Sequence, residues 1–373
     1  MKVLHFILGK ANKDRANGVN QVIAGLAKYT ARYGVDVRVI GKAGSVKKEG
    51  ELIQRDGFTI QAFSQLGLQL SKAVDEAIVW ADVVHLHGVF SPWNLWVAKK
   101  CNQLQKPYVV TLHNGLALDR QTSTTTKIKK SLYHWLLQRQ HLEKSAGIHM
   151  LTEEETTEAL SWFSPRHQFY IPNGIDLDDY PTLLPHNHSQ VDEIKIGYLG
   201  RVSPEKNLDS LCKAISLMRN NNNKLRLQIA GPESPYLKKL LTDYDDKGVE
   251  WVGPKYGADK IAFLRDIDLF VHPSLCDVFS IAAMEALAIG TPLLITRTAK
   301  ASYFYDRQAF FMCEPTPYGL SRGLERALQQ QTEWSQYILR GRELIENQLN
   351  WSIAAVNLIK EYDLIRQRVA NES

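Results

Sequence analysis

The sequence predicts an α/β protein of two domains, and three observations support this. Short apolar runs alternate with longer amphipathic stretches along the whole chain, a pattern typical of parallel sheets with crossover helices. The 373 residues exceed the length at which a single hydrophobic core keeps growing. Segment 172–193 combines prolines and a glycine with a polar run that cannot form a core, so it predicts a domain boundary.

The individual elements follow from the spacing of apolar residues. The runs that predict strands are 3–8, 35–40, 82–87, 107–113 and 147–152, then 194–199, 225–230, 249–252, 268–272 and 292–296. Helical spacing predicts helices over 19–33, 207–219 and 334–369. We expect a first domain over 1–180, a second over 181–345, and a final helix in 346–373 that packs back on the first domain.

Composition limits the classes of partner and the compartment. The net charge of +5 and the pI near 8.8 suit an anionic partner, but the basic residues are dispersed rather than interleaved with aromatics, which argues against nucleic acid. The N-terminal apolar run is too short for a signal peptide, and no stretch approaches the ~20 apolar residues of a membrane span. We expect a cytoplasmic protein, either free or at the inner face of the plasma membrane.

Four cysteines are widely spaced along the chain, without a C-x-x-C pair or a histidine cluster at zinc spacing. We expect reduced thiols that act as small core residues. They are Cys101, Cys212, Cys276 and Cys313.

A basic loop follows the predicted strand 194–199. Its sequence, GRVSPEKN over 200–207, leads into a helix, and ligands of open α/β sheets bind at the carboxyl ends of strands. Gly200 permits a tight turn, Arg201 offers a planar fork to phosphate oxygens, and Lys206 adds a point charge. These features predict a phosphate site, with solvated surface charge as the alternative.

A carboxylate lies alone in an apolar helix. Glu285 is the only ionisable residue of the predicted helix 281–289, where a carboxylate is costly unless it has a partner. Ribose hydroxyls would suit it, and a buried ion pair with a neighbouring Lys or Arg is the alternative. Asp277 stands eight residues earlier, in the loop before the helix, from which it could reach a sugar.

The two segments together resemble a known signature. GRVSPEKN, followed about seventy residues later by HPSLCDVFSIAAMEALAIGTP, is similar to the motifs of family-4 retaining glycosyltransferases of the GT-B fold. The resemblance covers essentially the whole chain and implies two Rossmann-like domains that face each other across a cleft. Its weaker parts are the glycine loop near Gly18, HLHG at 85–88, TLH at 111–113, IPNGID at 171–176 and AGPE at 230–233.

The resemblance assigns roles to individual residues. Arg201 and Lys206 match the basic pair that binds the donor diphosphate and stabilises the leaving group, and Glu285 matches the carboxylate that binds the ribose. Asp277 stands where the family usually has Glu, near the transferred sugar. His113 matches a histidine of the first domain that faces the reacting sugar.

Three further positions belong to the expected donor site. Gly18 matches the loop glycine that approaches the β-phosphate and the acceptor. Val278 and Ser280 replace the usual glycines around a matching Phe279, where backbone amides would bind sugar hydroxyls. The resemblance thus implies catalytic roles for His113, Arg201, Lys206 and Asp277, and a donor site that also includes Gly18, Phe279, Ser280 and Glu285.

The implied activity is retaining transfer of a hexose from a UDP-sugar or GDP-sugar to a glycan or lipid-linked saccharide, in bacterial surface polysaccharide or lipopolysaccharide synthesis. The first domain would bind the acceptor and the second the donor. We expect no cofactor and no metal, because the cations balance the diphosphate, and we assign no protein nucleophile. Asp266-Ile267-Asp268 resembles a metal-binding Asp-x-Asp element, but capping and packing at a helix-to-strand junction explain it better.

Two other functions remain open. One is a nucleotide-sugar-binding partner subunit without activity, and the other is a nucleotide-sugar epimerase of the same fold. The stretch 127–137 is helical, basic and amphipathic. It predicts either peripheral contact with an anionic membrane or a solvated basic face over a packed apolar one.

Overall fold

The computed structural model describes most of the chain as two compact units. Unit 1 comprises Met1–Asn173 and Trp351–Ser373, and unit 2 comprises Gly174–Asn350. The expected boundaries lay at 180/181 and 345/346. The residues that the structure describes are 1–7, 18–43, 46, 48–65, 67–113, 115–116, 124–180, 183, 193–219, 225–245, 247–277, 280–299 and 308–372.

Unit 1 is built on an eight-stranded sheet of order β3-β4-β2-β1-β5-β6-β7-β8. All neighbours pair in parallel except β3 with β4. The strands are β1 Lys2–Ile7, β2 Asp36–Lys42, β3 Leu52–Arg55, β4 Phe58–Phe63, β5 Val83–His87, β6 Tyr108–Thr111, β7 Gly147–Met150 and β8 Gln168–Tyr170.

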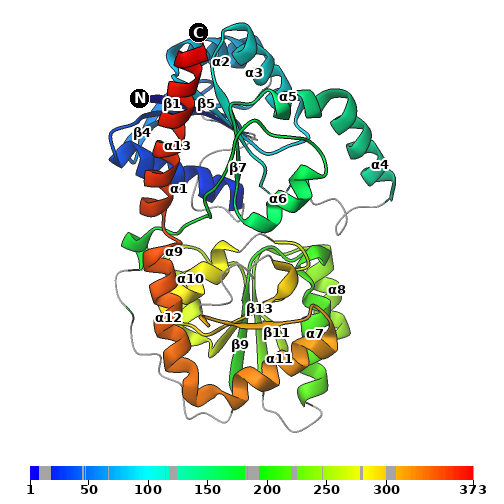
Figure 1. Ribbon diagram of the computed structural model, residues 1–373. Helices are drawn as coiled ribbons and strands as arrows, with labels where there is room; N and C mark the ends of the chain where they lie inside the picture. Colours follow the sequence, from blue (N-terminus) through cyan, green and yellow to red (C-terminus); the bar gives the residue numbers. More distant parts are fainter. Residues whose placement is uncertain are drawn as a thin grey trace. The chain divides into compact units, whose positions relative to one another are not determined.

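Helices flank the sheet of unit 1 (Figure 1). They are α1 Gly18–Arg32, α2 Leu68–Trp80, α3 Pro92–Gln103, α4 Thr124–Tyr133, the π-helical turn η1 His134–Gln138, α5 Arg139–Glu143, α6 Glu153–Leu160 and α13 Trp351–Glu372. One core joins α2, α3, α5 and α6 to the strands. The last helix packs on α1, where a Cβ at Gly25 would lie 2.3 Å from the Trp351 ring, so only glycine allows this approach.

Unit 2 holds a six-stranded sheet of order β11-β10-β9-β12-β13-β14, parallel throughout. Its strands are β9 Ile194–Leu199, β10 Leu225–Ala230, β11 Val249–Trp251, β12 Leu269–His272, β13 Leu293–Thr296 and β14 Phe311–Cys313. A core of α9, α10 and α12 covers one face and a core of α7, α8 and α11 covers the other (Figure 1).

In its described residues, unit 2 has α-helices and four short 3-10 turns. The elements are η2 Leu177–Asp179, η3 Pro204–Lys206, α7 Leu208–Arg219, α8 Pro235–Asp243, α9 Gly257–Asp266, α10 Ile281–Ile289, η4 Arg297–Ala299, α11 Pro317–Gln329, η6 Gln331–Glu333 and α12 Trp334–Asn347. The helical stretch expected over 334–369 is therefore two helices, α12 and α13, and the chain passes from unit 2 to unit 1 between them.

Each sheet has one point where the strand order reverses direction. In unit 1 the chain builds outward from β1 through β2, then returns to place β5 on the other side of β1. In unit 2 the same reversal falls between β9 and β12. Ligands of open α/β sheets bind in the crevice at such switch points, beyond the carboxyl ends of the strands. The α/β class is confirmed. We expect functional side chains to gather at these two switch points, beyond the carboxyl ends of the strands.

All four cysteines are free and buried, as expected for core thiols. Their burial also raises the pKa of Cys101, Cys212 and Cys313 to about 12, which keeps these thiols protonated and unreactive.

Candidate functional site

The loop after β9 is held in a defined path by two close approaches. The Tyr198 hydroxyl donates to the carbonyl of Arg201 at 2.7 Å. A Cβ added at Gly231 would lie 2.1 Å from the carbonyl oxygen of Gly200, so the loop after β10 can pass only as glycine. The Arg201 side chain itself is exposed. The backbone of this loop is thus fixed while its guanidinium remains accessible to an anion.

Asn207 ties the loop after β9 to the loops after β12 and β14. Its backbone is left-handed, with φ of 58°, a conformation for which Asn is among the better-suited residues. Its side-chain amide donates to the carbonyls of Pro273 and Pro315 at 3.1 and 2.8 Å. The Leu275 amide also donates to the carbonyl of Glu205 at 3.0 Å. The two motif segments recognised in the sequence therefore form one rigid rim.

Lys206, Asp277 and His272 form a charge cluster at this rim. The Lys206 ammonium donates to both Asp277 carboxylate oxygens at 2.6 and 2.5 Å, and His272 Nε2 lies 2.8 Å from one of them. Burial alone would raise the pKa of Asp277, but the His272 hydrogen bond and the Lys206 charge outweigh it and hold that pKa well below its usual range. Asp277 is therefore an anion that fixes the position of Lys206.

Glu285 has partners within unit 2. The Lys260 ammonium on α9 lies 2.5 Å from one carboxylate oxygen, and both side chains are largely buried. Burial raises the pKa of Tyr180, and the Glu285 charge and a hydrogen bond to it raise it further, so the phenol is protonated. The buried ion pair left open by the sequence is the contact that the structure shows for Glu285.

The Asp-x-Asp segment serves a junction, as expected. The Lys195 amide donates to the Asp268 carboxylate at 2.8 Å, and the Lys195 ammonium pairs with Asp266 at 2.9 Å. Both contacts fasten the start of β9 to the start of β12, at the edge of the sheet opposite to the charge cluster. The junction accounts for both carboxylates, through contacts with Lys195 rather than through the capping that was expected.

The other predicted donor-site residues fall in different places. Val278 and Phe279 lie outside the described residues. Ser280 precedes α10 as its N-cap, without a side-chain capping bond. Gly18 is the first residue of α1, and the loop before it lies outside the described residues.

His113 lies in unit 1, two residues after β6, with a left-handed backbone of φ 50°. Such a conformation is uncommon for a residue other than glycine and often marks a functional position. His113 Nε2 faces His87 Nδ1 at 3.1 Å, and His87 Nε2 faces His5 Nδ1 at 2.9 Å. The carboxyl ends of β5 and β6 thus carry a line of histidines that begins inside β1, at the switch point of this sheet.

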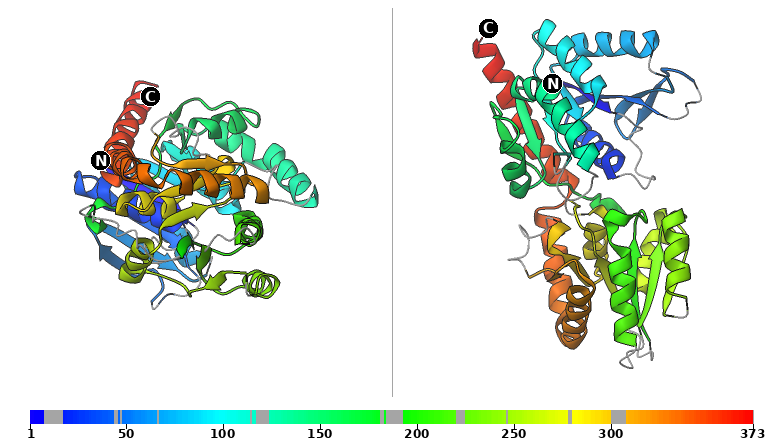
Figure 2. Two further views of the ribbon diagram at one scale, coloured as in Figure 1. Left: turned by 90° about the horizontal axis from the view of Figure 1, so that it is seen from below. Right: turned by 90° about the vertical axis from the view of Figure 1, so that its right-hand side faces the viewer.

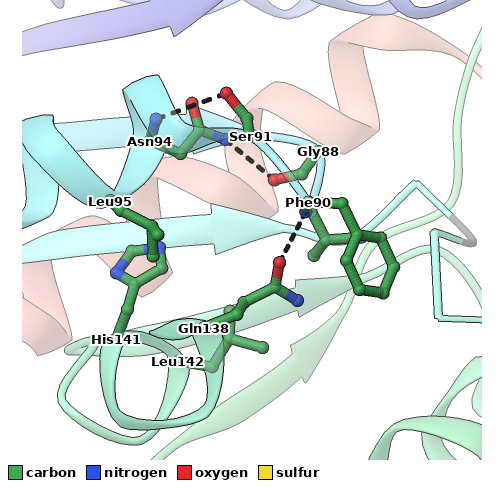
Figure 3. A pocket seen from close by; sticks show the side chains of 9 residues that line it. Gly88, Phe90, Ser91, Asn94, Leu95, Gln138, His141 and Leu142 are labelled. Atoms are coloured by element: carbon green, nitrogen blue, oxygen red, sulfur yellow. Dashed lines mark hydrogen bonds between the residues drawn. The ribbon is translucent and has the colours of Figure 1, made fainter. Parts of the chain in front are cut away.

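The loop after β5 is clamped by side chains of α3 and η1 (Figure 3). The Asn94 amide donates to the carbonyls of His87 and Gly88 at 3.1 and 2.9 Å, and the Phe90 amide donates to the Gln138 side chain at 2.5 Å. Phe90 has φ of 58°, so the bond that its amide donates to Gln138 holds a strained backbone. Gln138 is the last residue of the π-helical turn, a feature that often occurs at functional sites. The small hollow in Figure 3 belongs to this clamp.

Some residues of the site were not predicted from the sequence: Lys260, Tyr180, His272 and the histidines of β1 and β5. Lys260 carries no local signal, because its importance comes only from its distance to Glu285. The histidines did carry a signal. His5, His85, His87 and His149 occupy apolar strands of a parallel sheet, where buried polar side chains need hydrogen-bond partners.

Two doubly wound units with polar side chains at their switch points define an open α/β fold of the kind that binds ligands at such points. The family models specify it further. Glycosyltransferase Family 4 matches residues 16–179, and Glycosyl transferases group 1 matches residues 181–344. The chain belongs to the family-4 glycosyltransferases of the GT-B fold, and the expected family and fold are confirmed.

Relatives of known function and structure agree with this assignment. The D-inositol 3-phosphate glycosyltransferase of Jonesia denitrificans is 21% identical, over 97% of this chain and 94% of the relative. The sucrose-phosphate synthase of Thermosynechococcus elongatus has a TM-score of 0.79 at 16% identity, with 100% of both chains covered. Anabaena Alr3699/HepE in complex with UDP-glucose has a TM-score of 0.69 at 16% identity, over 100% and 99% of the two chains. The structural likenesses at these identities show the fold alone.

Proposed function

We propose that this glycosyltransferase moves a hexose from a nucleoside diphosphate sugar to a glycan or lipid-linked saccharide, with retention of anomeric configuration and without a metal. The main support for this proposal is the Lys206–Asp277–His272 cluster at the carboxyl ends of β9 and β12, together with the exposed Arg201 in the same loop as Lys206. A switch point that presents two cations suits a diphosphate.

In this reaction the two cations, Arg201 and Lys206, would stabilise the departing diphosphate. The acceptor hydroxyl attacks the anomeric carbon from the side of the leaving group, the bond from that carbon to the diphosphate oxygen breaks, and the acceptor proton passes to the diphosphate. Arg201 would bind its oxygens through the planar guanidinium and Lys206 as a point charge. Because Asp277 already holds Lys206, the donor would share this ammonium with the carboxylate, and Asp277 would meet the sugar.

The remaining donor contacts extend this proposal. Glu285 would accept from ribose hydroxyls while keeping its bond to Lys260, since a carboxylate has about four lone-pair positions. His113 would contact the reacting sugar from unit 1, and Gly18 would lie near the β-phosphate. Phe279 and Ser280 would surround the sugar.

A binding panel with variants tests the donor site. UDP-, GDP- and ADP-hexoses are screened by thermal shift, since the true donor stabilises the folded state by mass action. Arg201→Ala and Glu285→Ala should each weaken binding of that donor at least tenfold by calorimetry, whereas Arg322→Ala, an exposed arginine of α11, should not. Equal binding by all three variants would refute the site.

Product analysis separates transfer from the other two functions. Incubation of the donor with the protein should release nucleoside diphosphate slowly without acceptor and faster with a saccharide acceptor. An epimerised sugar nucleotide would instead support the epimerase, and tight binding without any turnover would support the partner subunit. Loss of transfer in EDTA that manganese restores would refute the metal-free mechanism.

The surface of α4 and η1 supports membrane contact in surface polysaccharide or lipopolysaccharide synthesis. No residue of α4 is buried, so the packed apolar face that the sequence left open is not what the structure shows. More than half of each apolar side chain is exposed beside basic residues, and α4 projects from the edge of unit 1 (Figures 1 and 2). The apolar residues are Ile128, Leu132, Trp135, Leu136 and Leu137, and the basic ones are Lys127, Lys129, Lys130 and Arg139. No helix among the described residues could span a bilayer.

We propose that this surface rests on an anionic membrane that carries the acceptor. In flotation assays the protein should bind vesicles with acidic lipids at low salt, but not vesicles of neutral lipid. Leu136→Glu should abolish binding, whereas Leu339→Glu, at a leucine of unit 2 that is also more than half exposed, should not. Vesicle binding that survives Leu136→Glu would refute the assignment.

A further inference from the structure

Three imidazole rings of unit 1 form a continuous hydrogen-bonded chain. The ring centres of His5 and His87 lie 5.2 Å apart and those of His87 and His113 lie 5.4 Å apart, with planes inclined by 18° and 30°. Facing nitrogens at 2.9 and 3.1 Å therefore place the rings edge to edge. The chain starts at fully buried His5 and ends at half-buried His113.

All three rings are neutral at physiological pH. Burial, with help from His149, lowers the pKa of His5 and of His113 to about 3, and burial also holds the pKa of His87 well below its usual range. A neutral imidazole carries one N–H and one lone pair. The direction of either hydrogen bond therefore fixes the direction of the other, and only two arrangements of the chain exist.

The buried end decides between the two arrangements. His5 Nε2 is buried and has no hydrogen-bond partner. One arrangement leaves a lone pair there and the other leaves an N–H. Buried N–H groups without an acceptor are rarer than under-used acceptors. The favoured arrangement therefore has His5 Nδ1–H donating to His87 Nε2, and His87 Nδ1–H donating to His113 Nε2.

A second network has its direction set independently. The Ile171 carbonyl accepts from His149 Nε2 at 2.9 Å, so His149 Nδ1 accepts from the Thr111 hydroxyl at 2.8 Å. Thr111 then accepts from His85 Nε2 at 2.6 Å, and His85 Nδ1 accepts from the Tyr362 hydroxyl at 2.5 Å. His85 is thus fixed as its Nε2–H tautomer by its own partners.

The two networks together leave the histidine cluster without a free set of nitrogens for a metal. The nitrogens of His5, His85 and His87 lie within 4.8 Å of one another, close enough to attract an ion. Both nitrogens of His85 and both of His87 already bond to protein groups. His5 Nε2 is the one nitrogen of the three rings without a partner, and a single ligand does not make a structural site.

We propose that His5 and His87 are positioning residues that hold His113 as its Nδ1–H tautomer, so that His113 presents a hydrogen-bond donor to an oxygen of the transferred sugar. No described residue bonds His113 Nδ1. The left-handed backbone of His113 and the Asn94 clamp on the His87 carbonyl fix the two ends of the last bond. The sugar as ligand rests on the proposed function; the tautomer does not.

The tautomer can be read directly, without substrate. Nitrogen-15 labelling of histidine and long-range proton–nitrogen correlation spectra at pH 7.5 distinguish protonated from bare ring nitrogens. His113 should show a proton on Nδ1 and none on Nε2, as should His87 and His5, whereas His85 and His149 should show the reverse. A proton on His113 Nε2, or a mixture of tautomers, would overturn the proposal.

Two substitutions at His5 separate positioning from a structural role. His5→Asn places an amide donor near the position of Nδ1 and should keep the tautomer of His113 and the turnover. His5→Leu removes the donor, and should give mixed tautomers and at least a tenfold lower kcat, with KM for the donor within twofold. His141→Gln, at a buried histidine outside the chain, is the matched control and should change neither. Equal kcat in the Leu and Asn variants would overturn positioning.

The outcome also remains informative if the proposed function fails. If the spectra show the predicted tautomers and the wild-type protein transfers no sugar, the proposed function fails and the hydrogen-bond chain stands. If transfer is observed but His113 carries its proton on Nε2, the proposed function stands and the hydrogen-bond chain fails.

Discussion

Acid should destabilise unit 1 well before it affects unit 2. Six histidines of unit 1 have strongly lowered pKa values, owing mainly to burial: about 3 for His5 and His113, about 4 for His141 and His149, and well below the usual range for His85 and His87. Burial also lowers the pKa of His134. The histidines of the unfolded chain have pKa values near 6.5. Between pH 6.5 and the pKa values of the same histidines in the folded state, the unfolded chain therefore binds more protons than the folded chain. The stability is therefore fully present above about pH 6.5 and falls as the pH drops below it.

The magnitude follows from the number of rings. A shift from pH 7 to pH 5.5 costs about 1 kcal/mol for each of these six, so about 6 kcal/mol in all. That loss is a large part of the stability of a typical domain and lowers the melting temperature of a domain of this size by roughly 12–24 °C.

Calorimetry at the two pH values measures this loss, and hydrogen exchange corrected for its intrinsic pH dependence assigns it to a unit. Unit 2 is the internal control, since His272 is its one histidine among the described residues. His141→Gln should reduce proton uptake on unfolding by up to one. A shift of less than about 3 °C, or an equal shift of both units, would refute the reasoning.

Three other perturbations test particular contacts. Asp277→Asn leaves Lys206 without its anion, so calorimetry should show nucleoside diphosphate binding about 3–10-fold tighter, while sugar transfer falls. Weaker binding of the diphosphate would contradict this. Asp266→Asn, at an exposed carboxylate, is the control. Lys260→Met strands the Glu285 carboxylate and should cost about 3 kcal/mol in urea unfolding, most of it recovered when Glu285→Leu is added; a cost below about 0.5 kcal/mol would show that the pair is solvated. Gly231→Ala should force the Gly200 loop outward and weaken donor binding, whereas Gly67→Ala, which meets open space, should not; unchanged donor affinity in Gly231→Ala would show that the loop adapts.

The sequence predicted most strands because buried parallel strands are continuous apolar runs. β9 and β10 match their predicted ranges, since each is a compact run between turn signals. β3, β4, β8 and β14 were not predicted. β3 and β8 are short and lie at the edges of the sheet, where half-exposed residues give no clear pattern. Such edge strands lack a regular alternation of apolar and polar residues, and their pairing depends on strands that are distant in the sequence.

The candidate site was predictable where one motif brings its own chemistry. Arg201 and Lys206 were found because a basic loop follows a strand, and Glu285 because it is alone in an apolar helix. The pairings were not predictable. Which cation meets Glu285 depends on how α9 packs on α10, and the bond between Asp277 and His272 depends on the path of the loop after β12. Contacts of this kind follow from tertiary packing rather than from local sequence.

The position of Tyr362 near the end of the chain determines when unit 1 can be completed during synthesis. Its hydroxyl on α13 completes the network through His85, yet unit 2 lies between it and the rest of unit 1 in the chain. Unit 2 is continuous and can fold as soon as it has left the ribosome, whereas the network of His85 in unit 1 cannot be completed until α13 has been made. The first part of the chain to be made is thus the last to be finished.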